Sequence, residues 1–273
     1  MGPPTYLSEI VAAHRAMAAA DHRDVGSLME AAGRAPATRG FGTALARSGI
    51  EGLAVVAEIK RRSPSKGELD PGLDPAQLAR QYAEGGARCL SVLTDADYFG
   101  GSAADLAAGR AACALPVLRK DFTLSPADVA DARLMGADAV LLIVTALSDT
   151  ELADLHALAK SFGLDVLVEV HDEDELDRAL EAGATLVGVN QRDLSSFEVD
   201  HDRALRLAPL LPDHVVAVAE SGVRHGDDAR RLAEAGYQAV LVGESLLRSA
   251  ERAAAVRALS GHRVGTRGGR RVS

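Results

Sequence analysis

The chain has few cysteines, few aromatic residues and no tryptophan. Its two cysteines, Cys89 and Cys113, lie in apolar stretches without CxxC or metal-ligand spacing. We therefore expect no disulfide framework, which fits a protein of the reducing cytosol. The eight histidines, His156, His171 and His201 among them, show neither HxH nor HExxH spacing. We predict no metal site on this basis.

Long apolar runs and an excess of positive charge are also missing. No run approaches the ~20 residues of a membrane span. The N-terminus lacks the basic segment and apolar core of an export signal. The formal net charge of −9 and the pI near 5.4 argue against a nucleic-acid surface. We therefore expect a cytoplasmic protein with no membrane partner and no nucleic-acid partner.

Apolar, β-branched runs alternate with segments of helical periodicity from Val55 onward. The expected strands lie near residues 55–60, 89–94, 116–120, 139–144, 165–170, 186–190, 215–220 and 239–243. The expected helices lie near residues 75–84, 103–112, 126–135, 149–162, 172–182, 201–210, 226–235 and 249–259. The strands are continuously apolar, as parallel strands covered by helices are. These repeated units predict a single α/β domain, a closed (β/α)8 TIM barrel; the alternative is an open doubly wound sheet, which usually has five or six strands.

The chain is expected to have three regions. Residues 1–50 form an N-terminal helical extension packed on the barrel, because one set of residues recurs there at helical spacing. This set is Leu7, Ile10, Val11, His14 and Met17. Residues 31–49 are rich in small residues, Arg and Thr and are expected to be an irregular connection. Residues 51–259 form the catalytic barrel, and residues 260–273 form a Gly/Arg-rich tail that is either disordered or in contact with an anionic partner.

Acidic, basic and amide side chains stand at the carboxyl ends of the expected strands. Glu58 and Lys60 share a face of the first strand, because alternate side chains of a strand point the same way. Alone, this pair could be a structural ion pair beside a solvated basic turn. Other strands end similarly, with Lys120, Glu169 and Asn190. Since catalytic residues of such barrels lie at the carboxyl ends of the strands, we expect these side chains to meet at one mouth.

Seven motifs, in this order and at these strand ends, resemble those of the indole-3-glycerol phosphate synthase family. They are EIKRRSPS (58–65), SVLTDADYFGG (91–101), LRKDF (118–122), LVEV (167–170), GVNQRDL (188–194), AESG (219–222) and VGESL (242–246). The resemblance implies a carboxy-lyase of tryptophan biosynthesis. It converts 1-(2-carboxyphenylamino)-1-deoxyribulose 5-phosphate to indole-3-glycerol phosphate, CO2 and water. It takes this small phosphorylated substrate without a metal or organic cofactor.

The resemblance also implies catalytic roles. Lys120 is expected to protonate the carbonyl oxygen, and Glu169 to move protons during the later dehydration, each worth about 10²–10⁴ in rate. Lys60 would neutralise the aromatic carboxylate, steer its loss as CO2, and could share the work of the acid. Glu58 would orient the lysines and keep them protonated. Asn190 would bond the sugar hydroxyls.

Further residues are expected to bind the aromatic end of the substrate. Phe99, Phe122 and Leu194 would form the walls of this part of the pocket. Leu141 and Ile143 are either walls or ordinary core.

Three residues near the last strands have two possible placements. Arg192 holds its loop and balances charge, unless it is a solvated surface residue. Glu220 and Ser221 are neighbours, so a regular strand turns only one of them inward. We favour Ser221 for substrate contact and keep Glu220 as a second candidate, unless the end of the strand twists and presents both.

The phosphate is expected at the loops after the first, seventh and eighth strands. Ser63 would offer a hydroxyl there, and Gly222 and Gly243 would let the backbone approach the anion. Many relatives carry Gly-Ser where this chain has Gly243-Glu244. We expect Glu244 to contribute its N–H while its carboxylate turns to solvent.

Two other functions fit the same residues. One is another phosphate-binding barrel enzyme, a phosphosugar isomerase or an aldolase; the aldolase would use Lys120 as a Schiff-base nucleophile. The other is a non-catalytic barrel that binds phosphate or a pathway partner. The joint presence of the five expected catalytic residues speaks against the second. The sequence does not determine whether the chain associates with other enzymes of tryptophan synthesis.

Overall fold

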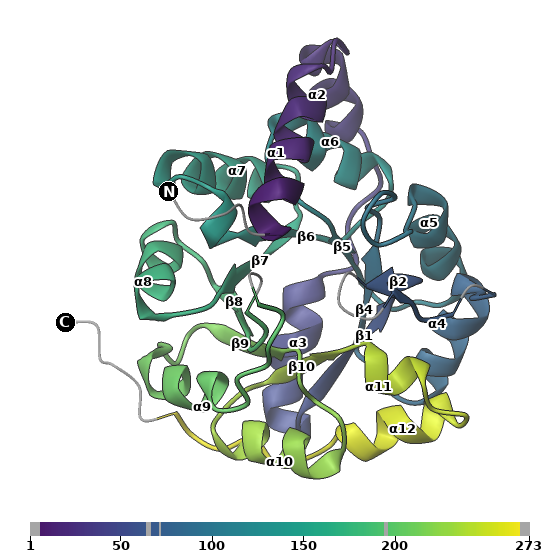
Figure 1. Ribbon diagram of the computed structural model, residues 1–273, viewed down its shortest axis with the longest axis vertical. Coiled ribbons are helices and arrows are strands. Elements are labelled where there is room, and N and C mark those ends of the chain that lie inside the picture. The colour runs from purple at the N-terminus through teal and green to yellow at the C-terminus, as the bar shows by residue number, and fades with distance from the viewer. Residues whose placement is uncertain (1–5, 64–66, 71, 194–195, 268–273) are drawn as a thin grey trace.

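Parallel strands close into a barrel in the computed structural model, which describes residues 6–63, 67–70, 72–193 and 196–267 (Figure 1). The strands are β1 (Ala54–Ile59), β4 (Cys89–Leu93), β5 (Val117–Lys120), β6 (Ala139–Ile143), β7 (Asp165–Val170), β8 (Leu186–Asn190), β9 (Val216–Glu220) and β10 (Ala239–Val242). Because β1 pairs with both β4 and β10, the sheet closes on itself. The predicted (β/α)8 barrel is confirmed, and the open sheet is excluded. A short hairpin of β2 (Arg62–Ser63) and β3 (Gly67–Glu68) follows β1.

Helices cover the outside of the barrel, and several begin at a side chain that caps them. They are α4 (Pro75–Glu84), α5 (Ala103–Ala112), α6 (Pro126–Leu134), α7 (Asp149–Ser161), α8 (Glu173–Glu181), α9 (Arg203–Leu207), α10 (Gly226–Glu234), α11 (Glu244–Leu247) and α12 (Arg252–Leu259), with short 3-10 turns η1 (Val144–Ala146) and η2 (Ala208–Leu210). Ser125 and Ser148 each form a capping box, which satisfies backbone N–H groups at the start of α6 and α7. Gly136 and Gly183, after α6 and α8, have φ of 87° and 84°, so the predicted turns into the next strands need glycine.

Three helices precede the barrel: α1 (Tyr6–Ala19), α2 (Val25–Gly33) and α3 (Phe41–Glu51). The predicted N-terminal helix is confirmed, but the irregular connection expected over residues 31–49 holds only for 34–40, because α2 and α3 take up the rest. Phe41 and Leu45 are fully buried, and α3 packs against β1, β4, β7 and β9, so it closes the amino-terminal end of the barrel. These two residues were the main apolar marks of α3 among small and polar neighbours. Helices α1 and α2 project beyond the ring of helices around the barrel, and α2 lies against α6 (Figure 1).

The described part of the expected tail packs against the barrel instead of leaving it. The Arg267 guanidinium donates to the carbonyl oxygen of Val215 at 2.6 Å and is largely buried. The N–H of Gly265 donates to the carbonyl oxygen of Ala233 at 2.8 Å. Residues 268–273 lie outside the described residues. Among the helices that the structure describes, none has the length and apolar character needed to cross a membrane.

Candidate active site

A cavity of about 730 Å³ opens at the carboxyl ends of the barrel strands. Its lining includes every predicted site residue that the structure describes. These are Glu58, Lys60, Ser63, Phe99, Lys120, Phe122, Glu169, Asn190, Arg192, Glu220, Ser221, Gly222, Gly243 and Glu244. Leu194 lies outside the described residues. Leu141 and Ile143, left open between wall and core, also line the cavity.

Lys120 stands at the centre of a network of charged side chains. Its ammonium donates to Oε2 of Glu169 and to Oε2 of Glu220, each at 2.7 Å. The amide of Asn190 donates to Oε1 of Glu169 at 3.0 Å and accepts a hydrogen bond from the Ser221 hydroxyl at 2.9 Å. Strands β5, β7, β8 and β9 therefore each contribute one side chain to one connected network, and Ser221, which follows β9, joins it.

A second ion pair lies on β1. The ammonium of Lys60 donates to Oε1 of Glu58, and both side chains are largely buried. Their shared face is therefore the interior face of the barrel, as strand alternation predicts. The negative charge of Glu58 also acts on Lys120 across the cavity.

Burial and charge set the protonation of the central network. Burial alone would lower the pKa of Lys120, but the charges of Glu169, Glu220 and Glu58 outweigh it and raise this pKa. Burial alone would raise the pKa of Glu169, but Lys120 and His171 hold it well below its usual range. Burial raises the pKa of Glu220 to about 7, and the charge of Glu169 adds to this while Lys120 opposes it. The Lys120 side chain is thus charged, Glu169 is an ionised hydrogen-bond acceptor, and Glu220 is a carboxyl that titrates near neutrality.

Glu220 and Ser221 both face the cavity, which is the alternative that we expected if the strand end twists. Strand β9 ends at Glu220, and Ser221 has φ of 64°, in the left-handed region. The chain therefore leaves the strand geometry at Ser221, and alternation no longer applies. Such a conformation costs about 1–3 kcal/mol in a non-glycine residue. Glu220, which we ranked second, makes the direct contact with Lys120.

We expect Glu220→Gln to stabilise the fold near pH 8 but not near pH 4.5. In the folded protein the pKa of Glu220 is raised from 4.5 to about 7, chiefly by burial. The stability from its bound proton is complete below pH 4.5 and is lost as the pH rises through about 7, an effect on the order of 3 kcal/mol. Glutamine cannot ionise, so its advantage should grow between about pH 5 and pH 8. Urea unfolding at several pH values measures this, and a pH-independent difference would contradict it.

The expected phosphate end of the cavity contains two glycines that cannot be replaced without a clash. A Cβ on Gly243 would lie 2.5 Å from Oε1 of Glu58, and one on Gly222, where φ is 76°, would lie 2.7 Å from Val199. The Glu244 carboxylate is paired with the guanidinium of Arg248 at 3.1 Å instead of standing free in solvent. The guanidinium of Arg248 therefore offsets the negative charge that Glu244 adds at the expected phosphate end.

Sequence reasoning missed several cavity-lining residues. Arg224, Ser245 and Arg248 follow the predicted phosphate residues in the loops after β9 and β10. Arg224 and Arg248 were detectable as neighbours of the AESG and VGESL motifs, and Ser245 stands within VGESL itself. Tyr6 and Phe197 close the aromatic end, with ring centroids 5.2 Å apart. Tyr6 was not detectable because it belongs to a helix assigned to a separate extension. Phe197 was not detectable because it stands outside every quoted motif.

Arg192 holds the loop after β8, one of the two placements that we considered. Its guanidinium donates to the carbonyl oxygen of Phe197 at 2.9 Å, and its backbone pairs with Val199. Its backbone N–H donates to Oδ1 of Asn190 at 3.0 Å. Arg192 is therefore connected both to the wall of the cavity and to the central network.

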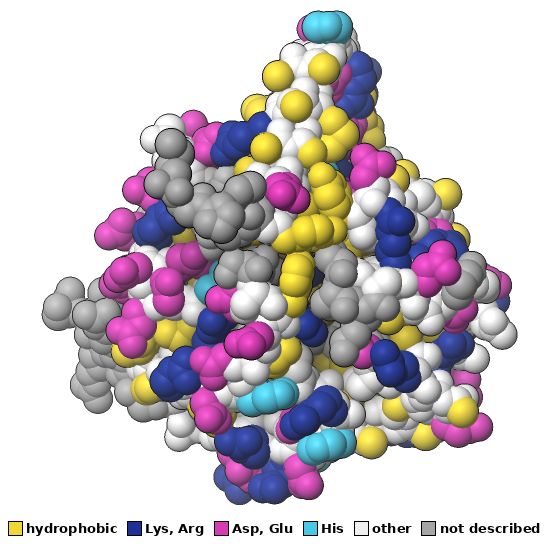
Figure 2. All heavy atoms as spheres, in the orientation of Figure 1, with side chains coloured by type: hydrophobic (Ala, Val, Ile, Leu, Met, Phe, Trp, Pro, Cys, Tyr) yellow, Lys and Arg dark blue, Asp and Glu magenta, His cyan; other side chains and the backbone are white. Residues whose placement is uncertain are grey.

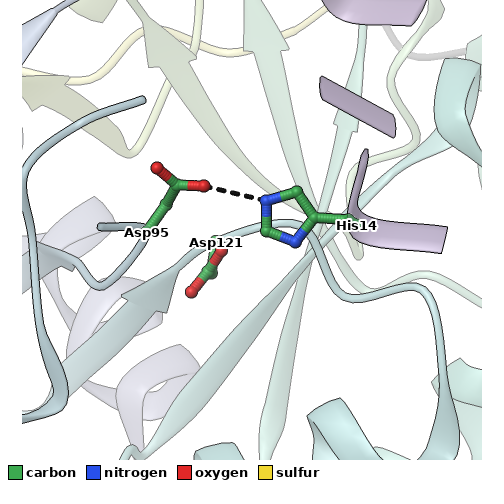
Figure 3. A group of neighbouring side chains, drawn as sticks. All are labelled: His14, Asp95 and Asp121. Carbon is green, nitrogen blue, oxygen red and sulfur yellow. Dashed lines mark hydrogen bonds and ion pairs between the residues drawn. The ribbon is translucent and has the colours of Figure 1, made fainter. Parts of the chain in front are cut away.

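His14 fastens α1 to the barrel (Figure 3). Its Nε2 lies 2.8 Å from Oδ2 of Asp95, and its ring packs on Phe122 with centroids 5.1 Å apart. His14, Asp95 and Asp121 lie close enough to hold a cation. However, Asp95 already accepts the N–H groups of Tyr98 and Phe99. The geometry therefore favours a structural contact that holds α1 on the barrel over a metal site.

Asp121 is also engaged. Its carboxylate accepts the N–H of Phe122 at 2.9 Å and pairs with the guanidinium of Arg119 at 3.0 Å. The positive charge of Arg119 opposes a bound cation.

Hydrophobic side chains continue from the mouth along the projecting α1–α2 end of the molecule (Figure 2).

The fold and the site define a (β/α)8-barrel enzyme with an acid–base cluster at the carboxyl ends of its strands. A model of the indole-3-glycerol phosphate synthase family matches residues 7–259. The chain belongs to this family, whose members are carboxy-lyases of tryptophan biosynthesis. It is 50% identical over 258 residues to the indole-3-glycerol phosphate synthase of Mycolicibacterium vanbaalenii, covering 94% of each chain. It is 54% identical over 210 residues to that of a Nocardioides species, covering 77% of this chain and 81% of the relative.

Solved structures of lower identity share the fold. A thiamine phosphate pyrophosphorylase from Pyrococcus furiosus aligns with a TM-score of 0.58 at 17% identity, covering 76% of this chain and 93% of its own. A (S)-3-O-geranylgeranylglyceryl phosphate synthase from Thermoplasma acidophilum aligns with a TM-score of 0.54 at 16% identity, covering 79% and 94%. At these identities the likeness shows the barrel and nothing about the reaction.

Proposed function

We propose that the chain converts 1-(2-carboxyphenylamino)-1-deoxyribulose 5-phosphate to indole-3-glycerol phosphate, CO2 and water, in the cytoplasm. The observation that carries this is the buried Lys120 ammonium held between Glu169 and Glu220, with the Lys60–Glu58 pair in the same cavity. The reaction needs a cation to protonate a ketone, another to meet a carboxylate, and a base. Membership of the family supports the proposal.

The first bond forms between the aryl carbon that bears the carboxylate and the ketone carbon. Lys120 gives its proton to the ketone oxygen as this carbon is attacked, so no free alkoxide forms. Lys60 faces the aromatic carboxylate. Its charge neutralises that group, and loss of CO2 then returns the bonding electron pair to the ring. Glu58 keeps Lys60 in place through their ion pair.

Dehydration completes the indole. The hydroxyl on the former ketone carbon leaves as water, and the neighbouring carbon loses a proton. We assign the movement of these protons to Glu169, which Lys120 and Asn190 hold in position. We assign Asn190 and Ser221 to the sugar hydroxyls, and Phe99 and Phe122 to the walls around the aromatic ring, because all four line the cavity.

The phosphate is assigned to the end of the cavity lined by Ser63, Gly222 and Gly243. There Arg248→Ala should raise the KM by about tenfold with little change in kcat, because the freed Glu244 carboxylate would repel the phosphate. The double variant with Glu244→Ser should recover most of this loss. Steady-state kinetics measure both variants. An unchanged KM in Arg248→Ala would contradict the role given to the Arg248–Glu244 pair.

The absence of tryptophan allows a direct test of the function. The purified chain is mixed with the authentic substrate, and product is followed as indole fluorescence without background from protein indole. We expect catalytic turnover, and loss of turnover with an analogue that lacks the phosphate. If the authentic substrate yields no indole product, the proposed function is wrong.

A further inference from the structure

A histidine lies behind Glu169, outside the lining of the cavity. His171 directly follows strand β7, two residues after Glu169. Its Nε2 is buried, has no hydrogen-bond partner among the described residues, and lies 3.7 Å from Oε1 of Glu169. The other oxygen of this carboxylate, Oε2, accepts a hydrogen bond from the Lys120 ammonium. Glu169 is therefore placed between a cavity lysine and a buried imidazole.

A second carboxylate fixes the orientation of the His171 ring. Its Nδ1 lies 3.0 Å from Oε2 of Glu175, and the same oxygen accepts the backbone N–H of His171 at 2.8 Å. The Thr145 hydroxyl donates to the other oxygen of Glu175. With Nδ1–H directed at Glu175, the ring presents Nε2 to Glu169. A carboxylate that accepts the Nδ1–H of an imidazole determines that the other ring nitrogen, Nε2, exchanges the proton.

The charges around His171 favour its protonated form. Glu169 faces it from β7 and Glu175 from α8, while Arg203 on α9 opposes them. Burial alone would lower the pKa of His171, but the bond to Glu175 and the two carboxylates raise it. An imidazolium so placed can give a proton to one oxygen of Glu169 and later take it back.

We propose that His171 is a positioning residue that stores the proton which Glu169 uses in dehydration. Protonated His171 passes its Nε2 proton to Glu169, which gives a proton to the leaving hydroxyl as the C–O bond breaks and the ring nitrogen supplies the electron pair. Water departs. The carboxylate of Glu169 then takes the proton of the neighbouring carbon, whose C–H electrons form the indole double bond, and returns it to His171. No net proton is consumed, so one carboxylate serves as acid and then as base. The inference rests on the proposed function.

The test compares the unaltered chain with His171→Gln in single turnover with the authentic substrate. The rate of indole formation should fall about tenfold to a hundredfold, less than the 10²–10⁴ expected for a direct acid–base group. CO2 release should change less than threefold, because decarboxylation precedes the relay. The unaltered rate should also decline as the pH rises through the pKa of His171, and this decline should disappear in His171→Gln. Glu175→Gln should move the decline to lower pH, since one of the charges that raise the pKa is removed.

A matched control and a measurement without substrate separate the outcomes. Glu173→Gln, at an exposed position on α8, should leave rates and the pH profile unchanged. In NMR titrations, Glu169→Gln should lower the pKa of His171, whereas Glu173→Gln should not. If product forms but His171→Gln keeps the parent rate and profile, or slows CO2 release equally, the relay is wrong and the function stands. If the unaltered chain forms no indole product, the function fails and the relay fails with it.

Discussion

Lys120→Met should lower kcat by about 10²–10⁴, the range for loss of a general acid. Lys120 is the cation between Glu169 and Glu220, and methionine is an unbranched side chain, one atom shorter, that removes the proton and the charge. Without the ammonium, two buried carboxylates face each other, so the pKa of each should rise and one should take up a proton. The variant therefore loses its acid and also the ionised state of its neighbour. Single-turnover indole fluorescence measures the loss.

The control for this variant is Lys160→Met. Lys160 is about half exposed on α7 and makes only a long contact of 3.4 Å to Asp165, so its removal should leave kcat unchanged. Binding of indole-3-glycerol phosphate to Lys120→Met should remain within about threefold, because the phosphate end of the cavity is untouched. Near-full activity of Lys120→Met would overturn the assignment of the acid.

Glu169→Gln should separate decarboxylation from dehydration. Glutamine keeps an oxygen for the Asn190 amide but presents an NH2 group to Lys120 and cannot accept a proton. We expect indole formation to slow by about 10²–10⁴. Ring closure and loss of CO2 should still occur, so each site should release one equivalent of CO2 well before indole appears.

Rapid quenching with labelled carboxylate measures CO2, and fluorescence measures indole in the same reaction. Glu181→Gln, on the exposed surface of α8, is the matched control and should release both products together. If CO2 and indole appear at the same reduced rate in Glu169→Gln, then Glu169 acts before decarboxylation and our order of roles is wrong.

The barrel was predictable because its strands carry uninterrupted apolar runs and its turns carry glycine. In β1 every residue is buried, and an apolar run fills the strand up to Ala57, before the charged Glu58 of the site. Gly136 and Gly183 mark the turns into β6 and β8, where a positive φ is required. Helix α3 escaped notice because its buried face consists mainly of Phe41 and Leu45, and two large residues one turn apart are a weak helical pattern.

The site was predictable as a set of residues but not as a network. Strand ends placed Lys120, Glu169 and Asn190 at one mouth. Which carboxylates share the lysine depends on how β5 faces β7 and β9 across the closed barrel, and alternation within one strand does not give that distance. Strand alternation could not decide between Glu220 and Ser221, since a left-handed residue at Ser221 ends the alternation and both side chains face the cavity. His171 was noted only for its lack of metal spacing.

The pairing of β1 with β10 has a consequence for the order of events during synthesis. Glu58 belongs to a strand that is synthesised long before β10 and Gly243, which packs against Glu58. Until translation passes residue 242, β1 has an unpaired edge that invites pairing with other chains. Glu58, Lys120 and Glu169 therefore share a closed cavity only after β10 has been made, and a nascent chain that stalls before residue 239 carries these side chains without the closed barrel.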